Sequence, residues 1–83
     1  MFTVYILYSA LLDRYYVGFT GDPIAVRLKK HIANHKGFTG KQSDWKVVHI
    51  ETYCEKQVAM KREKEIKNWK SRKMIEKLIS STE

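Results

Sequence analysis

Two tyrosines near the N-terminus have the spacing to share one face of a β-hairpin. Tyr5 and Tyr16 lie in two β-rich runs with ten residues between them, and the short link containing Asp13 predicts a turn. If the hairpin loop has an even number of residues, Tyr5, Tyr16 and Gly18 share a face, and Gly18 leaves space beside both phenols. A phenol has an unperturbed pKa near roughly 10, so it serves as a base only where positive charge stabilises the phenolate. The alternative is that both tyrosines are packing residues.

Arg27 and His31 form a second pair with chemical potential. They lie four residues apart in a predicted helix and are therefore neighbours on its surface. The stripe formed by Ile24, Leu28 and Ile32 places the pair where the helix meets the sheet. Arginine can clamp a phosphate, and histidine can relay a proton near neutral pH. The alternative is the ordinary polar boundary of an amphipathic helix.

Glu63 is the acid whose position is most informative. It lies between Ala59 and Ile66, beside the buried stripe of a predicted helix that is otherwise basic. A carboxylate there either pairs with Lys67 four residues later or holds a hard cation. Because magnesium often takes one or two carboxylates and completes its shell with water and phosphate oxygens, a lone glutamate is a weak metal signal. Pairing with Lys67 is the default interpretation of Glu63 taken by itself.

Positive charge is concentrated near the C-terminus. The net charge is +7, and residues 56–73 contain eight Lys or Arg against Glu63 and Glu65. A local excess of six positive charges attracts polyanions and makes their binding salt-dependent. Lys70, Arg72 and Lys73 are the candidate residues for contacting nucleic acid. The alternative is a solvated helical face.

Hydrophobic periodicity predicts the elements that position these residues. The predicted elements are, in order, strands over 2–9 and 15–20, a helix from Pro23 to about residue 36, a loop over 37–44, a strand over 45–53, a helix over 55–69 and a last helix capped by Ser71. In the second helix, Val58, Ala59, Ile66 and Trp69 are expected to face the core. The order ββα-β-αα predicts a small α/β or α+β layer domain.

Size and composition limit the remaining possibilities. The 83 residues predict a single domain over 1–83, and 43% apolar residues are enough for a core. The single cysteine, Cys54, cannot form an internal disulfide, which is typical of an intracellular protein. No stretch approaches the roughly 18 apolar residues that span a bilayer, so we expect a cytoplasmic protein without membrane contact. The oligomeric state stays open.

The candidate residues together resemble the GIY-YIG nuclease superfamily. The resemblance rests on Thr3-Val4-Tyr5, Tyr16-Val17-Gly18, the Arg27-x-x-x-His31 pair and Glu63 within AMKREKEIK. It runs in order from Tyr5 to about Ile79. Within this superfamily the chain resembles the small stand-alone proteins related to the nuclease module of the bacterial UvrC-type excision-repair protein.

The resemblance implies a three-stranded antiparallel sheet flanked by helices and metal-dependent cleavage of phosphodiester bonds, in DNA rather than RNA, with a role in repair or recombination. It implies that Tyr5 is the general base and that Tyr16 and His31 support the proton network. Arg27 would bind the scissile phosphate and stabilise its developing charge. Glu63 would hold Mg²⁺ or Mn²⁺. We therefore expect all five side chains to converge on one concave, partly exposed surface.

Two other classes of protein fit part of the same pattern. A non-catalytic nucleic-acid-binding module could retain the fold and the basic surface. A basic adaptor domain that docks an acidic protein fits the charge alone. Neither needs the five candidate residues together, which favours the nuclease.

Overall fold

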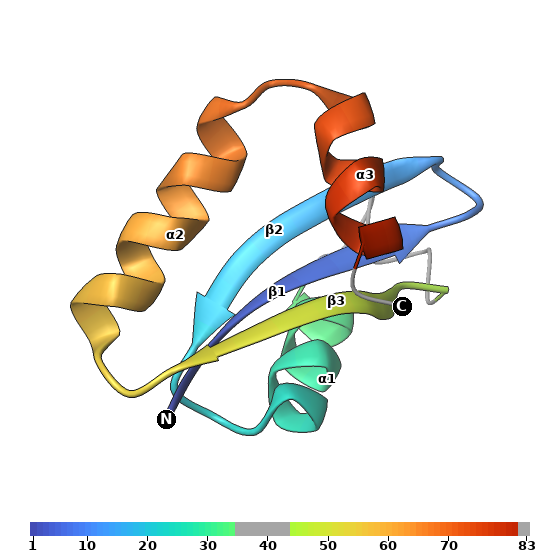
Figure 1. Ribbon diagram of the computed structural model, residues 1–83. Coiled ribbons are helices and arrows are strands. Elements are labelled where there is room, and N and C mark those ends of the chain that lie inside the picture. Colours follow the sequence, from blue (N-terminus) through green and yellow to red (C-terminus); the bar gives the residue numbers. More distant parts are fainter. Residues whose placement is uncertain (35–43, 82–83) are drawn as a thin grey trace.

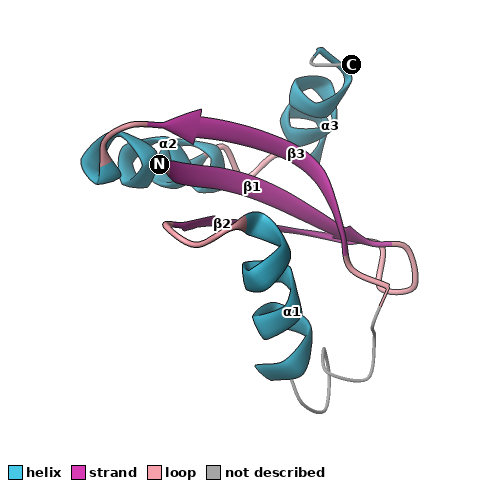
Figure 2. Cartoon of the chain, turned by 90° about the horizontal axis from the view of Figure 1, so that it is seen from below, coloured by secondary structure: helices cyan, strands magenta, loops and turns pink. Residues whose placement is uncertain are grey.

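The computed structural model shows a β-sheet with helices on both faces (Figures 1 and 2). The structure describes residues 1–34 and 44–81, and for residues 31–34 it describes the backbone alone. The elements are β1 (Phe2–Ser9), β2 (Arg14–Thr20), α1 (Ile24–Asn34), β3 (Lys46–Tyr53), α2 (Lys56–Asn68) and α3 (Arg72–Ser81). The predicted order ββα-β-αα and the mixed α/β class are confirmed.

The three strands form one antiparallel sheet in the order β2-β1-β3, with β1 at the centre. In the β1–β2 hairpin Tyr5 is paired with Gly18, and Leu7 is paired with Tyr16. Because side chains alternate between faces, Tyr5, Tyr16 and Gly18 share a face, as the even loop predicted. The β1–β3 register shifts between Ile6 and Leu7.

Both faces of the sheet are covered, which explains why β1 is apolar at consecutive positions. On one face, Tyr5 and Leu7 pack with Trp45 and with residues of α1. On the other face, Val4 and Ile6 pack with residues of α2 and α3. Figure 2 shows α1 on one side of the sheet and the other two helices on the opposite side. Full burial of such aliphatic side chains stabilises the fold by roughly 1.5–3 kcal/mol each.

Helix α1 begins at Ile24, one residue later than predicted. The Pro23 carbonyl accepts hydrogen bonds from the N–H groups of Val26, at 3.0 Å, and Arg27, at 3.1 Å. Pro23 therefore precedes the first helical residue rather than occupying that position. The predicted end of this helix near residue 36 and the loop predicted from residue 37 fall outside the described residues, apart from Asp44.

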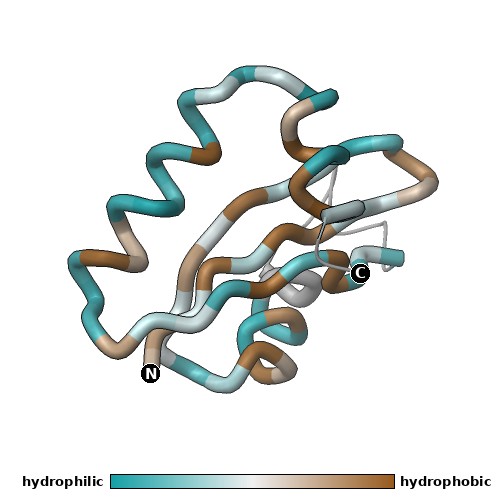
Figure 3. The backbone as a smooth tube through the Cα atoms, in the orientation of Figure 1, coloured by the Kyte–Doolittle hydropathy of each residue, from teal (hydrophilic) through white to brown (hydrophobic). Residues whose placement is uncertain are grey.

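Helix α2 buries a narrow line of side chains, and most of its surface is hydrophilic (Figure 3). Ala59 and Ile66 form this line. Val58 is 44% exposed, so its predicted inward position is wrong. The Val58 side chain points about 100° around the helix axis from that of Ala59, so it lies outside the narrow contact between α2 and the sheet. Helix α3 begins as predicted, because Oγ of Ser71 accepts a hydrogen bond from the Met74 N–H at 3.3 Å.

A polar network centred on Glu51 holds α2 to β3. Its carboxylate accepts hydrogen bonds from Nε of Arg62, at 2.9 Å, and from the Tyr53 hydroxyl, at 2.6 Å. Nε2 of His49 lies 2.8 Å from the same carboxylate, and the His49 side chain is buried. Burial raises the pKa of Glu51, but the hydrogen bonds from Arg62, Tyr53 and His49 outweigh it and lower this pKa to about 2.

This network predicts an acid-dependent part of the stability. The pKa of Glu51 is lowered from 4.5 to about 2 in the folded protein. The stability that Glu51 contributes is therefore present above the unfolded pKa of 4.5 and is lost as the pH falls through the folded pKa of about 2. Glu51→Gln should lower the free energy of unfolding at neutral pH by roughly 2–3 kcal/mol. It should also flatten the dependence of that free energy on acid pH, measured by urea unfolding. An acid profile identical to that of the wild type would contradict this assignment.

Candidate active site

The phenol of Tyr5 lies in a space that only a glycine neighbour can provide. A Cβ atom added at Gly18 would lie 2.6 Å from the Tyr5 hydroxyl and 3.2 Å from Cε1 of Tyr16. The Tyr5 ring therefore extends from β1 across β2, toward that edge of the sheet. The Tyr16 ring is stacked beside it, with centroids 6.5 Å apart. The space that the sequence predicted at Gly18 is confirmed.

Helix α1 contributes Arg27 to the same place. Nε of Arg27 donates a hydrogen bond of 3.1 Å to the Tyr5 hydroxyl. Its position follows from the helix, because Ile24 and Leu28 pack against the sheet and Arg27 lies at the edge of their stripe. The bond uses Nε, so the two terminal nitrogens of the guanidinium take no part in it. The structure thus joins Tyr5, Tyr16 and Arg27 in one cluster.

The electrostatic environment of Tyr5 favours its protonated form. Burial raises the pKa of Tyr5, the hydrogen bond and charge of Arg27 lower it, and the proximity of Tyr16 and Glu63 raises it. The net result is a pKa above the ordinary value of 10.0. At neutral pH the hydroxyl is therefore protonated, and added positive charge would be needed for it to accept a proton.

Glu63 approaches this cluster from the other face of the sheet. On α2, Arg62 and Glu63 flank the buried line, and because Arg62 reaches Glu51 on β3, Glu63 faces the β2 side. The Tyr5 ring extends toward the same edge strand, which explains why the Glu63 charge acts on the pKa of Tyr5. The carboxylate and the phenol are therefore both directed toward the β2 edge, from opposite faces of the sheet.

The fifth predicted residue, His31, follows Arg27 by one turn on α1, and its side chain lies outside the described residues. Convergence of all five side chains consequently stays a prediction. Three of them are joined by contact, and Glu63 is linked to them by its charge.

The donor groups near Tyr5 fit a cation with a single protein carboxylate. Among the described side chains, those of residues 1–30 and 44–81, no group of three from His, Cys, Asp or Glu could enclose a metal ion. Glu63 is 16% exposed, and its contact with Nζ of Lys67 is a loose 3.7 Å. Such a pair near the surface contributes little to stability, so a cation could compete with it. This arrangement matches the magnesium sites that rely mainly on water and phosphate oxygens.

The predicted nucleic-acid-binding residues are in different surroundings. Lys70 and Arg72 line a groove beside β2, and Lys73 is exposed without lining it. Two further cations line the same groove: Lys67, which belongs to the basic stretch of residues 56–73, and Arg14, which was missed in the sequence. Arg14 could have been found from the sequence, because it is two residues before Tyr16 on the same strand and so shares its face. Lys67 lies one helical turn after Glu63.

Arg72 makes extensive contacts within the chain. Its Nη1 donates to the Asp13 carbonyl at 3.0 Å, and its Nε donates to Glu76 at 3.2 Å. It also pairs with the Asp13 carboxylate, and its guanidinium lies over the Tyr15 ring, 5.3 Å from the centroid. These contacts raise the pKa of Arg72, with the hydrogen bond to Asp13 as the largest cause. Arg72 thus fastens α3 to the hairpin turn.

Comparison with known proteins places this arrangement in a wider context. The family model of the GIY-YIG catalytic domain matches residues 1–77. The solution NMR structure of the UPF0213 protein BH0048 from Bacillus halodurans is similar, with 32% identity and a TM-score of 0.61. The similarity covers 96% of this chain and 84% of that one. No curated protein matches the chain. Within the described residues, every helix is too short or too polar to cross a bilayer.

Proposed function

Because the chain belongs to the GIY-YIG family of nucleases, we propose that it is a metal-dependent endonuclease that hydrolyses phosphodiester bonds in DNA. The observation that carries the proposal is the buried Tyr5 hydroxyl, bonded to Arg27 at 3.1 Å beneath Gly18. A hydroxyl fixed by a guanidinium at a sheet edge is suited to place a water molecule against a phosphate. A role in repair or recombination and a cytoplasmic location belong to the same proposal.

Each residue in the cluster has a role that follows from its surroundings. The terminal nitrogens of Arg27 bind the scissile phosphate and stabilise the charge that develops on it. Tyr5 orients the attacking water, and Tyr16 holds the Tyr5 ring in place. Glu63 is the residue that would hold Mg²⁺ or Mn²⁺. When bound, the metal neutralises charge on the phosphate and its leaving oxygen.

Hydrolysis requires one proton to leave the water. Water oxygen bonds to phosphorus, the bond from phosphorus to the leaving oxygen breaks, and the water proton needs an acceptor. Tyr5 can accept it only as phenolate, a form that Arg27 favours and that burial opposes. Positive charge brought by a bound metal would shift that balance toward the phenolate.

The decisive experiment uses labelled single-stranded, duplex and branched DNA and their RNA counterparts, each with Mg²⁺, Mn²⁺ or EDTA. We expect DNA cleavage only with a divalent metal, stopped by EDTA and restored when metal is added back. If nothing is cut, and Mn²⁺ leaves the NMR signals around Glu63 unchanged, the enzyme proposal fails. The chain would then be a nucleic-acid-binding module that retains the fold.

A further inference from the structure

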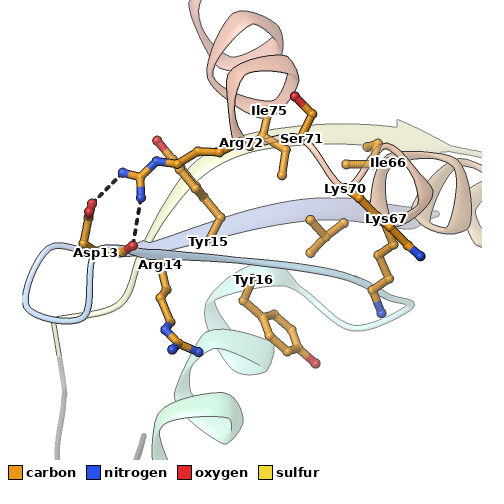
Figure 4. Close-up of a pocket in the computed structure, with 11 residues that line it drawn as sticks. Asp13, Arg14, Tyr15, Tyr16, Ile66, Lys67, Lys70, Ser71, Arg72 and Ile75 are labelled. Atoms are coloured by element: carbon orange, nitrogen blue, oxygen red, sulfur yellow. Dashed lines mark hydrogen bonds and ion pairs between the residues drawn. The ribbon is translucent and has the colours of Figure 1, made fainter.

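A groove of about 560 Å³ runs along the outer side of β2, next to the candidate active site. Figure 4 shows it bounded by β2, the end of α2 and the start of α3. Its apolar lining comes from Val17, Ile66 and Ile75, and its cationic lining includes Arg14, Lys67 and Lys70. The acid Asp13 also lines the groove, but its carboxylate is paired with Arg72. The groove therefore presents a net positive surface.

The groove is continuous with the cluster formed by Tyr5, Tyr16 and Arg27. Tyr16 lines the groove while its ring stacks on Tyr5. In Figure 4 the side chains of Arg14 and Tyr16 point to the same side of β2, the side that α1 covers. Lys67 lines the groove and also lies 3.7 Å from the Glu63 carboxylate. A ligand lying in the groove can thus reach the cluster without crossing the sheet.

Lys70 has a backbone conformation that its residue type does not favour. Its φ angle is 51°, in the left-handed region, at the junction of α2 and α3 where glycine is the usual residue. Asp13, at 52°, is the other non-glycine residue with positive φ in the described chain. Aspartate tolerates this region because its short side chain bonds locally, whereas a lysine side chain lacks that ability. The unfavourable backbone conformation points to a function for the ammonium group of Lys70 in the groove.

We propose that this groove binds the phosphate backbone of the DNA strand adjoining the scissile phosphate, through Arg14, Lys67 and Lys70. The inference rests on the proposed function, because the same strand continues to Arg27. A phosphodiester chain complements both the charge of the groove and its course along β2. When a phosphate is bound, Lys67 moves from Glu63 to that phosphate, and the carboxylate becomes available to a cation.

The test is Lys70→Asn, matched with Lys61→Asn. Both variants lose one charge, but Lys61 lines a separate surface with Gln57 and Lys64. Asparagine tolerates positive φ, so the melting temperature of Lys70→Asn should hold or rise. Binding of a fluorescent single-stranded DNA oligonucleotide is measured in EDTA across a salt series. We expect Lys70→Asn to weaken binding several-fold and to reduce the slope of log K against log salt by about 0.7. Lys61→Asn should change the binding affinity and the salt slope less than Lys70→Asn does.

Two outcomes separate this inference from the nuclease proposal. If Lys70→Asn and Lys67→Asn bind with the affinity and salt slope of Lys61→Asn, the groove is not the path of the strand. Metal-dependent cleavage by the wild type would still stand. If binding depends on Lys67 and Lys70 but nothing is cut with metal, the groove stands and the nuclease proposal fails.

Discussion

Glu63→Gln should remove metal-dependent cleavage while leaving DNA binding intact. The substitution keeps the volume of the side chain but removes the charge that would hold a divalent cation. Charge stabilisation by such a cation contributes several kcal/mol, so we expect the rate to fall by roughly 10³-fold or more. DNA affinity in EDTA should hold or rise slightly, because one negative charge is lost and Lys67, 3.7 Å away, loses its partner.

The matched control is Glu65→Gln, which makes the same change on the same helix. Glu65 pairs with Arg62 on the exposed side of α2, away from the β2 edge. It should keep the wild-type rate. The free energy of unfolding distinguishes loss of the metal site from loss of the fold. Removing the loose Glu63–Lys67 pair should lower it by no more than about 1 kcal/mol. Mn²⁺ should broaden the NMR signals around residue 63 in the wild type and not in Glu63→Gln. Equal rates for both variants would rule out Glu63 as the metal ligand.

Tyr5→Phe should lower the cleavage rate by roughly 10²–10⁴-fold, the usual effect of losing a positioned general base. It removes one hydroxyl from a residue that is 1% exposed and leaves Nε of Arg27 without its acceptor. The free energy of unfolding should therefore fall by about 1–2 kcal/mol. Tyr8→Phe is the control, because it deletes a hydrogen-bonded phenol from the same strand on the opposite face. A Tyr5→Phe enzyme as fast as Tyr8→Phe would show that Tyr5 is a packing residue.

The dependence on pH gives this prediction a second readout. Because the pKa of Tyr5 is raised above 10.0, the phenolate fraction increases with pH throughout the neutral and mildly alkaline range. The kcat/KM of the wild type should rise across this range, from about pH 7 to about pH 9. Tyr5→Phe should lose the part of that rise which belongs to the phenol. A parallel rise in both proteins would assign the titrating group elsewhere.

The sequence predicted the hairpin half of the site because its geometry is local. Alternation along a strand and the parity of a short loop place Tyr5 and Gly18 on one face without knowledge of the rest of the fold. The spacing along α1 likewise places Arg27 at the edge of its apolar stripe. These relations depend on residues close together in the chain, and the structure confirms the shared face and the contact of Arg27 with Tyr5.

Reasoning from local spacing could not predict where Glu63 lies relative to Tyr5. Periodicity placed Glu63 beside the buried line of its helix, but it did not show that α2 packs on the face opposite Tyr5. The approach of the two groups depends on β2 being an edge strand, and the sheet order β2-β1-β3 differs from the order of the strands in the chain. Counting charges likewise did not show that Arg72 is paired with Asp13, 59 residues away in the chain.

The position of β2 at the margin of the sheet has a consequence for how molecules of this protein behave toward one another. Edge strands are templates for adding a strand from another chain, and proteins guard them with charged side chains and with covering helices. The charged side chains that flank β2 here are those of Arg14, Lys67 and Lys70. These are the groups that we propose bind DNA. Repulsion between these like charges would oppose the pairing of two copies through β2, so we expect neutralising them to favour self-association as well as to weaken DNA binding.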